Sequence, residues 1–244
     1  MALTGVGLTD EIQALCGRPT NQVLLTNARV TRWLNEAVKK IAEECPDLEE
    51  LQFTNTTSLD TTGTILYALN EVTVGDVSTE DRVCHVFDVF YLDGNETRQL
   101  EYIHPDEFDA AWPDPTHSDI PHTKPTHWTR QGDLSEGYVK MMPFCLTAYH
   151  DDDLKFVGSM YPGEWTTEDS TEGRLKDCDE AIIAYGVWQG FKAIGDDMKA
   201  ALWRKTWTNP DPIYGEDYGE LEKIKFRSSR EHGWDGNIFY DSYE

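Results

Sequence analysis

The spacing of apolar residues predicts helices near the beginning of the chain. The segment TRWLNEAVKKIAEECPDL, which starts at Thr31, repeats apolar residues at intervals of three and four until Pro46 closes the run. This spacing predicts an amphipathic helix with a single apolar face. A shorter helix is predicted in TDEIQALCG, where Thr9 would cap the first turn and Gly17 would end the helix.

Helical spacing returns after residue 170. An apolar stripe is interrupted at Gly195, and we expect it to continue into a second helix. The stripe consists of Leu175, Cys178, Ile182, Tyr185, Trp188 and Phe191 before the glycine, and of Met198, Leu202 and Trp203 after it. A third helical segment would carry Tyr214, Tyr218 and Leu221 on one face. Because neither end of the chain can bury its apolar residues alone, we expect the two sets of helices to pack on each other.

Between these helices the pattern changes to that of β-strands. From about Phe53 apolar and polar residues alternate, and RVCHVFDVFYLDGNETRQLEYI predicts two strands joined at Asp93-Gly94-Asn95. The segment HPDEFDAAWPDPTHSDIPHTKPTHW then predicts a short helix followed by an extended loop. Residues 138–144 and 154–161 complete the pattern as the two strands of a hairpin.

The sequence therefore predicts an α+β fold, in which N- and C-terminal helices form a bundle and an antiparallel β module is inserted between them. The expected helical core comprises residues 1–52 and 170–230, and the β module comprises residues 53–169. Residues 231–244 form a third part, an extended aromatic C-terminal arm.

The arm is a candidate interface because it is short, aromatic and interrupted by glycines, so it cannot build a core of its own. Aromatic side chains supply much of the binding energy at protein interfaces, and such segments dock in grooves on partners. The candidate docking residues are Trp234, Ile238, Phe239, Tyr240 and Tyr243.

A row of four potential metal ligands separates the two strands of the predicted hairpin: His150, Asp151, Asp152 and Asp153. A calcium loop of the EF-hand type would need Gly at its sixth position and Glu at its twelfth, but counting from Asp151 gives Phe156 and Pro162. Neighbouring residues of a strand also point to opposite faces and rarely converge on one ion. We therefore interpret the row as the polar, exposed tip of a hairpin rather than as a metal site.

Charge narrows the classes of function. The 244 residues include 45 Asp and Glu against 21 Lys and Arg, which gives a formal net charge of −24 at pH 7. The excess is spread along the chain, so the protein repels nucleic acid, and sequence-specific binding of DNA or RNA is excluded. A protein that must stay near DNA without adhering to it would carry this sign of charge.

Other sequence features argue against metal, membrane and catalytic functions. The five cysteines are widely spaced and form no CxxC pair, which predicts reduced, mostly buried thiols and no zinc site. The chain contains no apolar run of membrane-spanning length and no signal peptide, so we expect a soluble protein made in a cytoplasm. It also contains no GxSxG motif and no complete dinucleotide-binding fingerprint, so we expect neither enzyme activity nor a cofactor.

Several motifs, taken in their order along the chain, are similar to those of a known family. WLNEAVKKIAEECPDL resembles an early helix of that family, TGTILYALNEVTV a following strand, and DEAIIAYGVWQGFKAIGDDMKAALWRKTW a closing helix. The strand, turn and short helix in DVFYLDGNETRQLEYIHPDEFDAAWPDP match as well. In TGTILYALNEVTV the chain departs from the family, because Leu69-Asn70 stands where the family usually has Leu-Pro. The family is that of the head–tail adaptor, or connector, proteins of tailed bacteriophages, including the tail tubular protein A group. The resemblance covers roughly residues 8–210.

The resemblance implies a structural virion protein at the head–tail junction. Such proteins form a ring, commonly of twelve copies, that lies below the portal, extends the DNA channel and provides a platform for the tail. The expected partners are other copies of the chain, the portal protein and a tail or nozzle protein, and DNA would pass through the ring without specific binding. The aromatic arm would dock on the portal, and the hairpin tip at His150–Asp153 would contact a neighbouring copy or the tail protein. The alternative is another structural protein of a phage tail tube, tail-completion complex or baseplate. A third class is a metal-dependent hydrolase that would use His150 and the aspartates.

Overall fold

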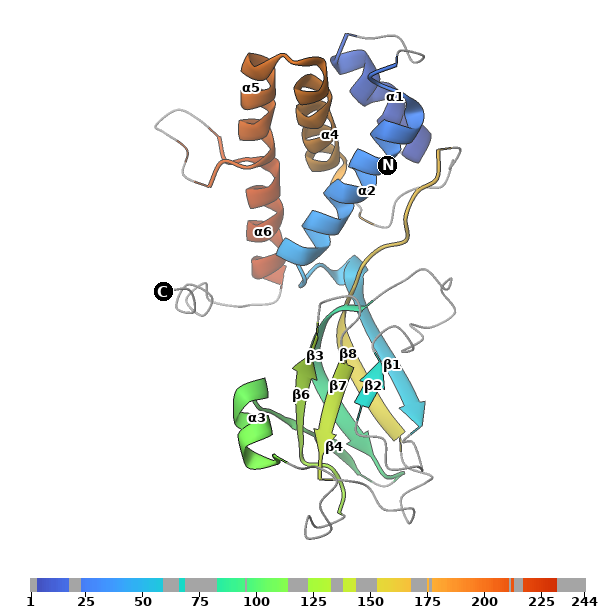
Figure 1. Cartoon of the computed structure of the whole chain (residues 1–244), viewed down its shortest axis with the longest axis vertical. Helices are drawn as coiled ribbons and strands as arrows, with labels where there is room; N and C mark the ends of the chain where they lie inside the picture. The colour runs from blue at the N-terminus through green and yellow to red at the C-terminus, as the bar shows by residue number, and fades with distance from the viewer. Residues whose placement is uncertain are drawn as a thin grey trace. The chain divides into compact units, whose positions relative to one another are not determined.

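The computed structural model describes residues 4–17, 23–58, 66–68, 83–94, 96–113, 123–132, 138–143, 153–167, 175, 177–210, 212 and 217–231. The chain divides into two compact units, one made of Met1–Leu51 with Pro162–Glu244 and the other of Gln52–Tyr161. The first unit is helical, and the second is built mainly from β-strands (Figure 1). The predicted α+β class is therefore confirmed: helices from both ends of the chain pack together, and β-sheets are inserted between them.

The helical unit is organised around one central helix. Its α-helices in the described ranges are α1 (Gly5–Leu15), α2 (Asn27–Glu44), α4 (Asp179–Ile194), α5 (Asp197–Trp207) and α6 (Glu220–Glu231), and a short 3₁₀ turn follows α2 at Glu49–Leu51. Helix α4 packs against α1, α2, α5 and α6. Because it has neighbours on several sides, α4 is buried without a break from Ala181 to Val187.

Both N-terminal helices begin about one turn before the predicted positions. The N-cap of α1 is Thr4 and that of α2 is Thr26, whereas Thr9 and Thr31 are buried inside the helices. A threonine hydroxyl inside a helix can donate to the carbonyl of the preceding turn, and Thr9 does so over 2.9 Å. Threonine alone therefore does not mark a helix start. The predicted end at Gly17 is confirmed, since this residue follows α1 with a φ of 66°.

Two glycines of α4 allow α1 to approach closely. A Cβ atom added to Gly186 would lie 2.3 Å from Cδ1 of Ile12, and one added to Gly190 would lie 2.6 Å from Sγ of Cys16. Both distances are far below ordinary van der Waals contact. The absence of a side chain at these two positions thus sets how near the two helices can pack.

Helix α5 turns a different face inward from the one predicted. Gly195, in the left-handed conformation with a φ of 84°, ends α4, and Asp196 caps α5. Because the helix is interrupted at Gly195, the helical period of α4 does not continue into α5, and the buried residues of α5 are Ala200 and Trp207. The prediction that the apolar stripe continues through Met198 and Leu202 is wrong, because these side chains are 85% and 63% exposed.

The β unit contains two four-stranded sheets. The first has the strand order β1-β8-β3-β4 and the second β2-β7-β6-β5. Neighbouring strands are antiparallel except for the parallel pair β5–β6. The elements are β1 (Gln52–Ser58), β2 (Leu66–Ala68), β3 (Val83–Leu92), β4 (Thr97–Gln99), β5 (Glu101–Tyr102), α3 (Pro105–Ala111), β6 (His127–Gln131), β7 (Tyr138–Met142) and β8 (Asp153–Met160).

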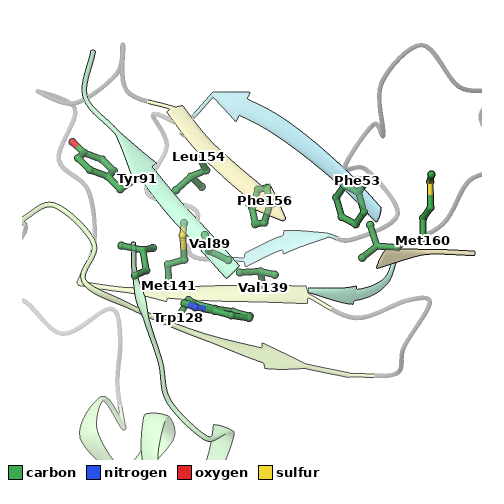
Figure 2. Packing of buried hydrophobic residues seen from close by; sticks show 11 residues of the cluster. Phe53, Val89, Tyr91, Trp128, Val139, Met141, Leu154, Phe156 and Met160 are labelled. Carbon is green, nitrogen blue, oxygen red and sulfur yellow. The ribbon is translucent and has the colours of Figure 1, made fainter. Parts of the chain in front are cut away.

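A shared core lies within the β unit (Figure 2). Alternate residues along the central strand β8, such as Leu154 and Phe156, are fully buried. They belong to the same cluster as Trp128 of β6 and Val139 of β7, which come from the other sheet. Inward-facing residues of both sheets therefore form one apolar core, as in a β-sandwich.

The two strands predicted on either side of Asp93-Gly94-Asn95 pair as β3 and β4, with Leu92 opposite Thr97, and Gly94 has a φ of 79°, while Asn95 lies outside the described residues. The strand predicted after this turn divides in two, because the amide of Leu100 donates to Val89 in one sheet and that of Glu101 donates to Thr126 beside the other. The predicted short helix is α3. The loop expected after α3 was extended too far, since His127–Gln131 forms strand β6.

The predicted hairpin of residues 138–144 and 154–161 is wrong. Strand β7 lies between β2 and β6, whereas β8 lies between β1 and β3 in the other sheet. Both edges of each strand are thus occupied by other partners, and β7 and β8 cannot pair with each other. The chain crosses from one sheet to the other between them.

Candidate assembly surfaces

The acidic row lies at the start of β8. Of its four residues the structure describes only Asp153, while His150, Asp151 and Asp152 lie outside the described residues. Asp153 opens β8 and pairs with Ser58 of β1 and Leu92 of β3, so it stands at one end of the first sheet. Across the described parts of the chain, no three metal-ligating side chains come together in a way that could hold an ion.

The aromatic arm follows helix α6. Its docking candidates Trp234, Ile238, Phe239, Tyr240 and Tyr243 all lie outside the described residues. The helix before the arm is anchored to the helical unit, since Leu221 and Ile224 are buried and Nζ of Lys225 lies 2.9 Å from Oε2 of Glu44. Glu44 is the last residue of α2, so this ion pair joins the middle of α6 to the end of α2.

The surroundings of Lys225 favour its ion pair with Glu44. Burial lowers the pKa of Lys225, but the hydrogen bond that its ammonium group donates to Glu44 and the nearby charge of Glu222 outweigh this effect, and the net pKa is raised. The lysine is therefore charged, and it joins α6 to the end of α2.

A basic hollow lies between α2 and α4 in this acidic protein. Its volume is about 310 Å³, and it is lined by Arg29, Arg32, Trp33, Gln189, Lys192 and Ala193. Arg32 is partly neutralised by Glu36, whose Oε1 lies 3.4 Å from Nε. Cations, an amide and an indole can hold a carboxylate of a partner, but they offer no nucleophile or general base.

The cysteines are buried thiols rather than activated ones. Cys16, Cys45, Cys84 and Cys178 are buried thiols outside any disulfide, which confirms the prediction for these four, whereas Cys145 lies outside the described residues. Burial raises the pKa of Cys45 to about 12 and that of Cys178 to about 11. A nucleophilic cysteine needs the opposite shift, so these thiols have a structural role.

Comparison with known families identifies the chain. Residues 4–209 match the SU10 adaptor protein family, a span that covers the β unit and most of the helical unit. The chain belongs to this family. It is therefore a phage adaptor protein, of a structural family and not an enzyme family, and the resemblance seen in the sequence is confirmed. No curated protein matches the sequence.

The family match also divides the adaptor's surfaces into two groups. It ends at residue 209, just after α5, so α6 and the arm lie beyond the matched region. The exposed apolar face of α5 lies inside it. Within the described part of the adaptor, none of the helices combines the length and the apolar character that a membrane span requires.

Two surface features of the adaptor were not found by sequence reasoning. One is the outward face of α5, and the other is a pair of half-exposed rings on and before α6, Tyr218 and Phe226, whose centroids lie 5.1 Å apart. Met198 and Leu202 are four residues apart, a spacing that fits an exposed apolar face of α5 as well as it fits a buried stripe. Only the position of the helix relative to α4 distinguishes these alternatives.

Proposed function

We propose that the adaptor forms a ring at the head–tail junction of the virion, below the portal, where it extends the DNA channel and provides the attachment platform for the tail. The observation that carries this proposal is the family match over residues 4–209, which covers the β unit and most of the helical unit. The ring would hold twelve copies.

The charge of the chain supports passage of DNA through the ring without specific binding. Twelve copies at −24 each would surround the channel with a large negative charge. Phosphates would be repelled from the wall by simple Coulomb forces, and no basic channel would retain the genome. The basic hollow at Arg29, Arg32 and Lys192 is small and local, and it suits an acidic side chain of a protein partner better than a DNA strand.

Partners of the ring are proposed to be the portal protein on one side and a tail or nozzle protein on the other. The arm, residues 231–244, would insert into the portal with Trp234, Phe239 and Tyr240 as anchors. The acidic segment His150–Asp153 would contact a neighbouring copy or the tail protein. Asp153, the one residue of this segment that the structure describes, stands at one end of the first sheet, which supports such a contact.

Deletion of residues 232–244 tests the role of the arm, because it leaves α6 (Glu220–Glu231) complete. Docking on purified portal-containing particles is then measured by co-sedimentation. We expect the deletion to abolish docking, whereas Tyr218→Ser, which changes an exposed ring before α6, serves as a control that retains docking. Undiminished docking of the deletion variant would overturn the arm proposal.

Electron cryo-microscopy of the particle tests the location. We expect density for the two-unit protein as a ring directly below the portal. Density farther along the axis, in a tail tube, a tail-completion complex or a baseplate, would instead assign the protein to that structure.

A further inference from the structure

Within the described part of the helical unit, two exposed faces lie on opposite sides, one on α1 and one on α5. Helix α4 packs against both α1 and α5, and these two helices lie on either side of it (Figure 1). A closed ring of identical subunits uses heterologous contacts, in which one surface of each copy meets a different surface of the next. Two distinct faces on opposite sides of the same unit are what such a contact requires.

The outward face of α5 is apolar with basic flanks. Ala200 and Trp207 point into the unit, so by the helical period Met198, Leu202 and Lys205 occupy the opposite side. Met198 and Leu202 lie one turn apart and form an exposed apolar ridge. The helix carries three basic residues, Lys199, Arg204 and Lys205, against one acidic residue, Asp197, in a chain whose net charge is −24.

The outward face of α1 has the opposite charge. Leu8 and Ile12 point into the unit, and Asp10, Glu11 and Ala14 are exposed on the other side. Helix α1 contains no lysine or arginine. Among the described residues, neither Asp10 nor Glu11 forms an ion pair. The half-exposed side chains of Val6 and Leu15 add apolar area beside the two carboxylates.

We propose that α5 of one adaptor copy packs against α1 of the next copy, and that this pair forms part of the contact between neighbours in the ring. The proposal rests on the ring function given above. The ridge of Met198 and Leu202 would pack beside the small side chain of Ala14, and Lys205 would face Asp10 and Glu11. A contact of α5 with α5 would instead bring like charges together, which disfavours a two-fold pairing.

The size of the helices sets the expected strength of this contact. Each helix has 11 residues, or about 16 Å of length. One pair of this length buries far less than the roughly 1,200 Å² of a stable protein interface. The isolated contact is therefore weak, and the free protein associates only at high concentration or when other contacts in the ring hold the copies together.

Cysteine trapping tests the proposal on the full chain. Ala14→Cys and Ala201→Cys each place a thiol on one of the two exposed faces. The two variants are oxidised at high protein concentration, separately and mixed, and the unchanged chain reports the background from its own five cysteines. We expect disulfide-linked dimers to form at least about tenfold faster in the mixture than in either variant alone. A variant that carries both cysteines is expected to form a ladder of disulfide-linked oligomers. If dimers form in the mixture no faster than with Ala201→Cys alone, the heterologous contact is overturned.

Charge reversal gives an independent test with a built-in rescue. Lys205→Glu is added to the Ala201→Cys variant and Glu11→Lys to the Ala14→Cys variant. Each reversal alone is expected to slow disulfide formation in the mixture several-fold. Mixing the two doubly substituted chains should restore the rate. Lys40→Glu on the exposed side of α2 makes the same charge change as Lys205→Glu and should leave the rate unchanged. Failure of the combined reversals to restore trapping would overturn the pairing of these charges.

The ring itself is checked separately by electron microscopy of the same preparation on portal particles. A ring that forms without α1–α5 disulfides overturns only the proposed contact. A chain that forms neither a ring nor disulfides overturns the proposed ring function as well.

Discussion

Replacing Gly158 by alanine is expected to destabilise the β unit strongly. Gly158 lies in β8, where its partners are Phe53 in β1 and Val86 in β3. The register of β3 shifts near His85, and this irregularity brings the backbone of β3 against Gly158. A Cβ atom at position 158 would lie 2.0 Å from the carbonyl oxygen of His85 and 3.0 Å from Cε1 of Phe53.

The expected cost follows from these distances. Ordinary van der Waals contact begins at 3.4 Å, so the carbonyl of His85 must withdraw by about 1.4 Å. Because it belongs to the backbone of β3, which pairs with β8 at this position, it cannot move without disturbing the β3–β8 hydrogen bonds. Overpacking a core costs about 1–3 kcal/mol and a lost hydrogen bond about 1 kcal/mol, so we expect a loss of about 3 kcal/mol.

Urea and thermal unfolding measure this loss, and hydrogen exchange of β3 and β8 shows whether it falls on the first sheet. A loss of about 3 kcal/mol corresponds to a decrease in Tm of roughly 10–20 °C for a domain of this size. The control is Ser159→Ala at the next position. Ser159 is fully buried, and its hydroxyl finds no hydrogen-bond partner among the described residues, so its removal is expected to be neutral or stabilising. A stability for Gly158→Ala within about 0.5 kcal/mol of the unchanged chain would refute the reasoning.

Three further predictions concern the thiols and the charge of the adaptor. Because Cys16, Cys45 and Cys178 are buried, they are expected to react with a thiol reagent at pH 8 only after unfolding, as measured by the release of chromophore with and without urea. The pKa of an unfolded cysteine thiol is near 9.0, whereas burial raises the pKa of Cys45 to about 12. The unfolded state therefore loses its proton first, and the free energy of unfolding is expected to fall as the pH rises above 9. This fall is expected to be less steep in Cys45→Ala. The net charge of −24 predicts no retardation of duplex DNA in gels at about 0.15 M salt, and a specific complex would contradict this.

The helices could be predicted from the sequence because their apolar spacing is long and regular. The face of α2 predicted from Trp33 to Ala42 is the one that is buried. The starts were misplaced because both Thr4 and Thr9 precede apolar residues at cap-like positions, and only the backbone shows which hydroxyl accepts from an amide. The outward face of α5 could not be predicted, because the left-handed turn at Gly195 resets the register between two helices.

The partners of the strands were harder to predict than the strands themselves. The turn between β3 and β4 has a strong local signature, but β7 and β8 are separated by residues 143–152, a longer connection than the two to five residues of most hairpins. The length of this connection was the one feature of the sequence that argued against a hairpin of β7 and β8. Strand β6 was missed because its short sequence follows a proline-rich segment, and its place in the sheet depends on long-range pairing with β7.

The candidate surfaces differ in how far local sequence can define them. The docking residues of the arm and the acidic row were selected by composition alone, and of these candidate residues the structure describes only Asp153. The faces of α1 and α5, by contrast, became candidates only once α4 was seen to separate them.

Helix α4 connects the proposed contacts of the adaptor. It supports α1 and α5, the two helices assigned to neighbouring copies, and it also packs against α6, from which the arm extends. Arg227 of α6 donates to the carbonyl of Asp177, two residues before α4 begins, so the start of α4 is tied to the helix that precedes the arm. A displacement of α6 by a docked partner would therefore act on the same buried helix that sets the spacing of α1 and α5. This arrangement gives a physical reason why docking through the arm would favour the geometry in which neighbouring copies fit together.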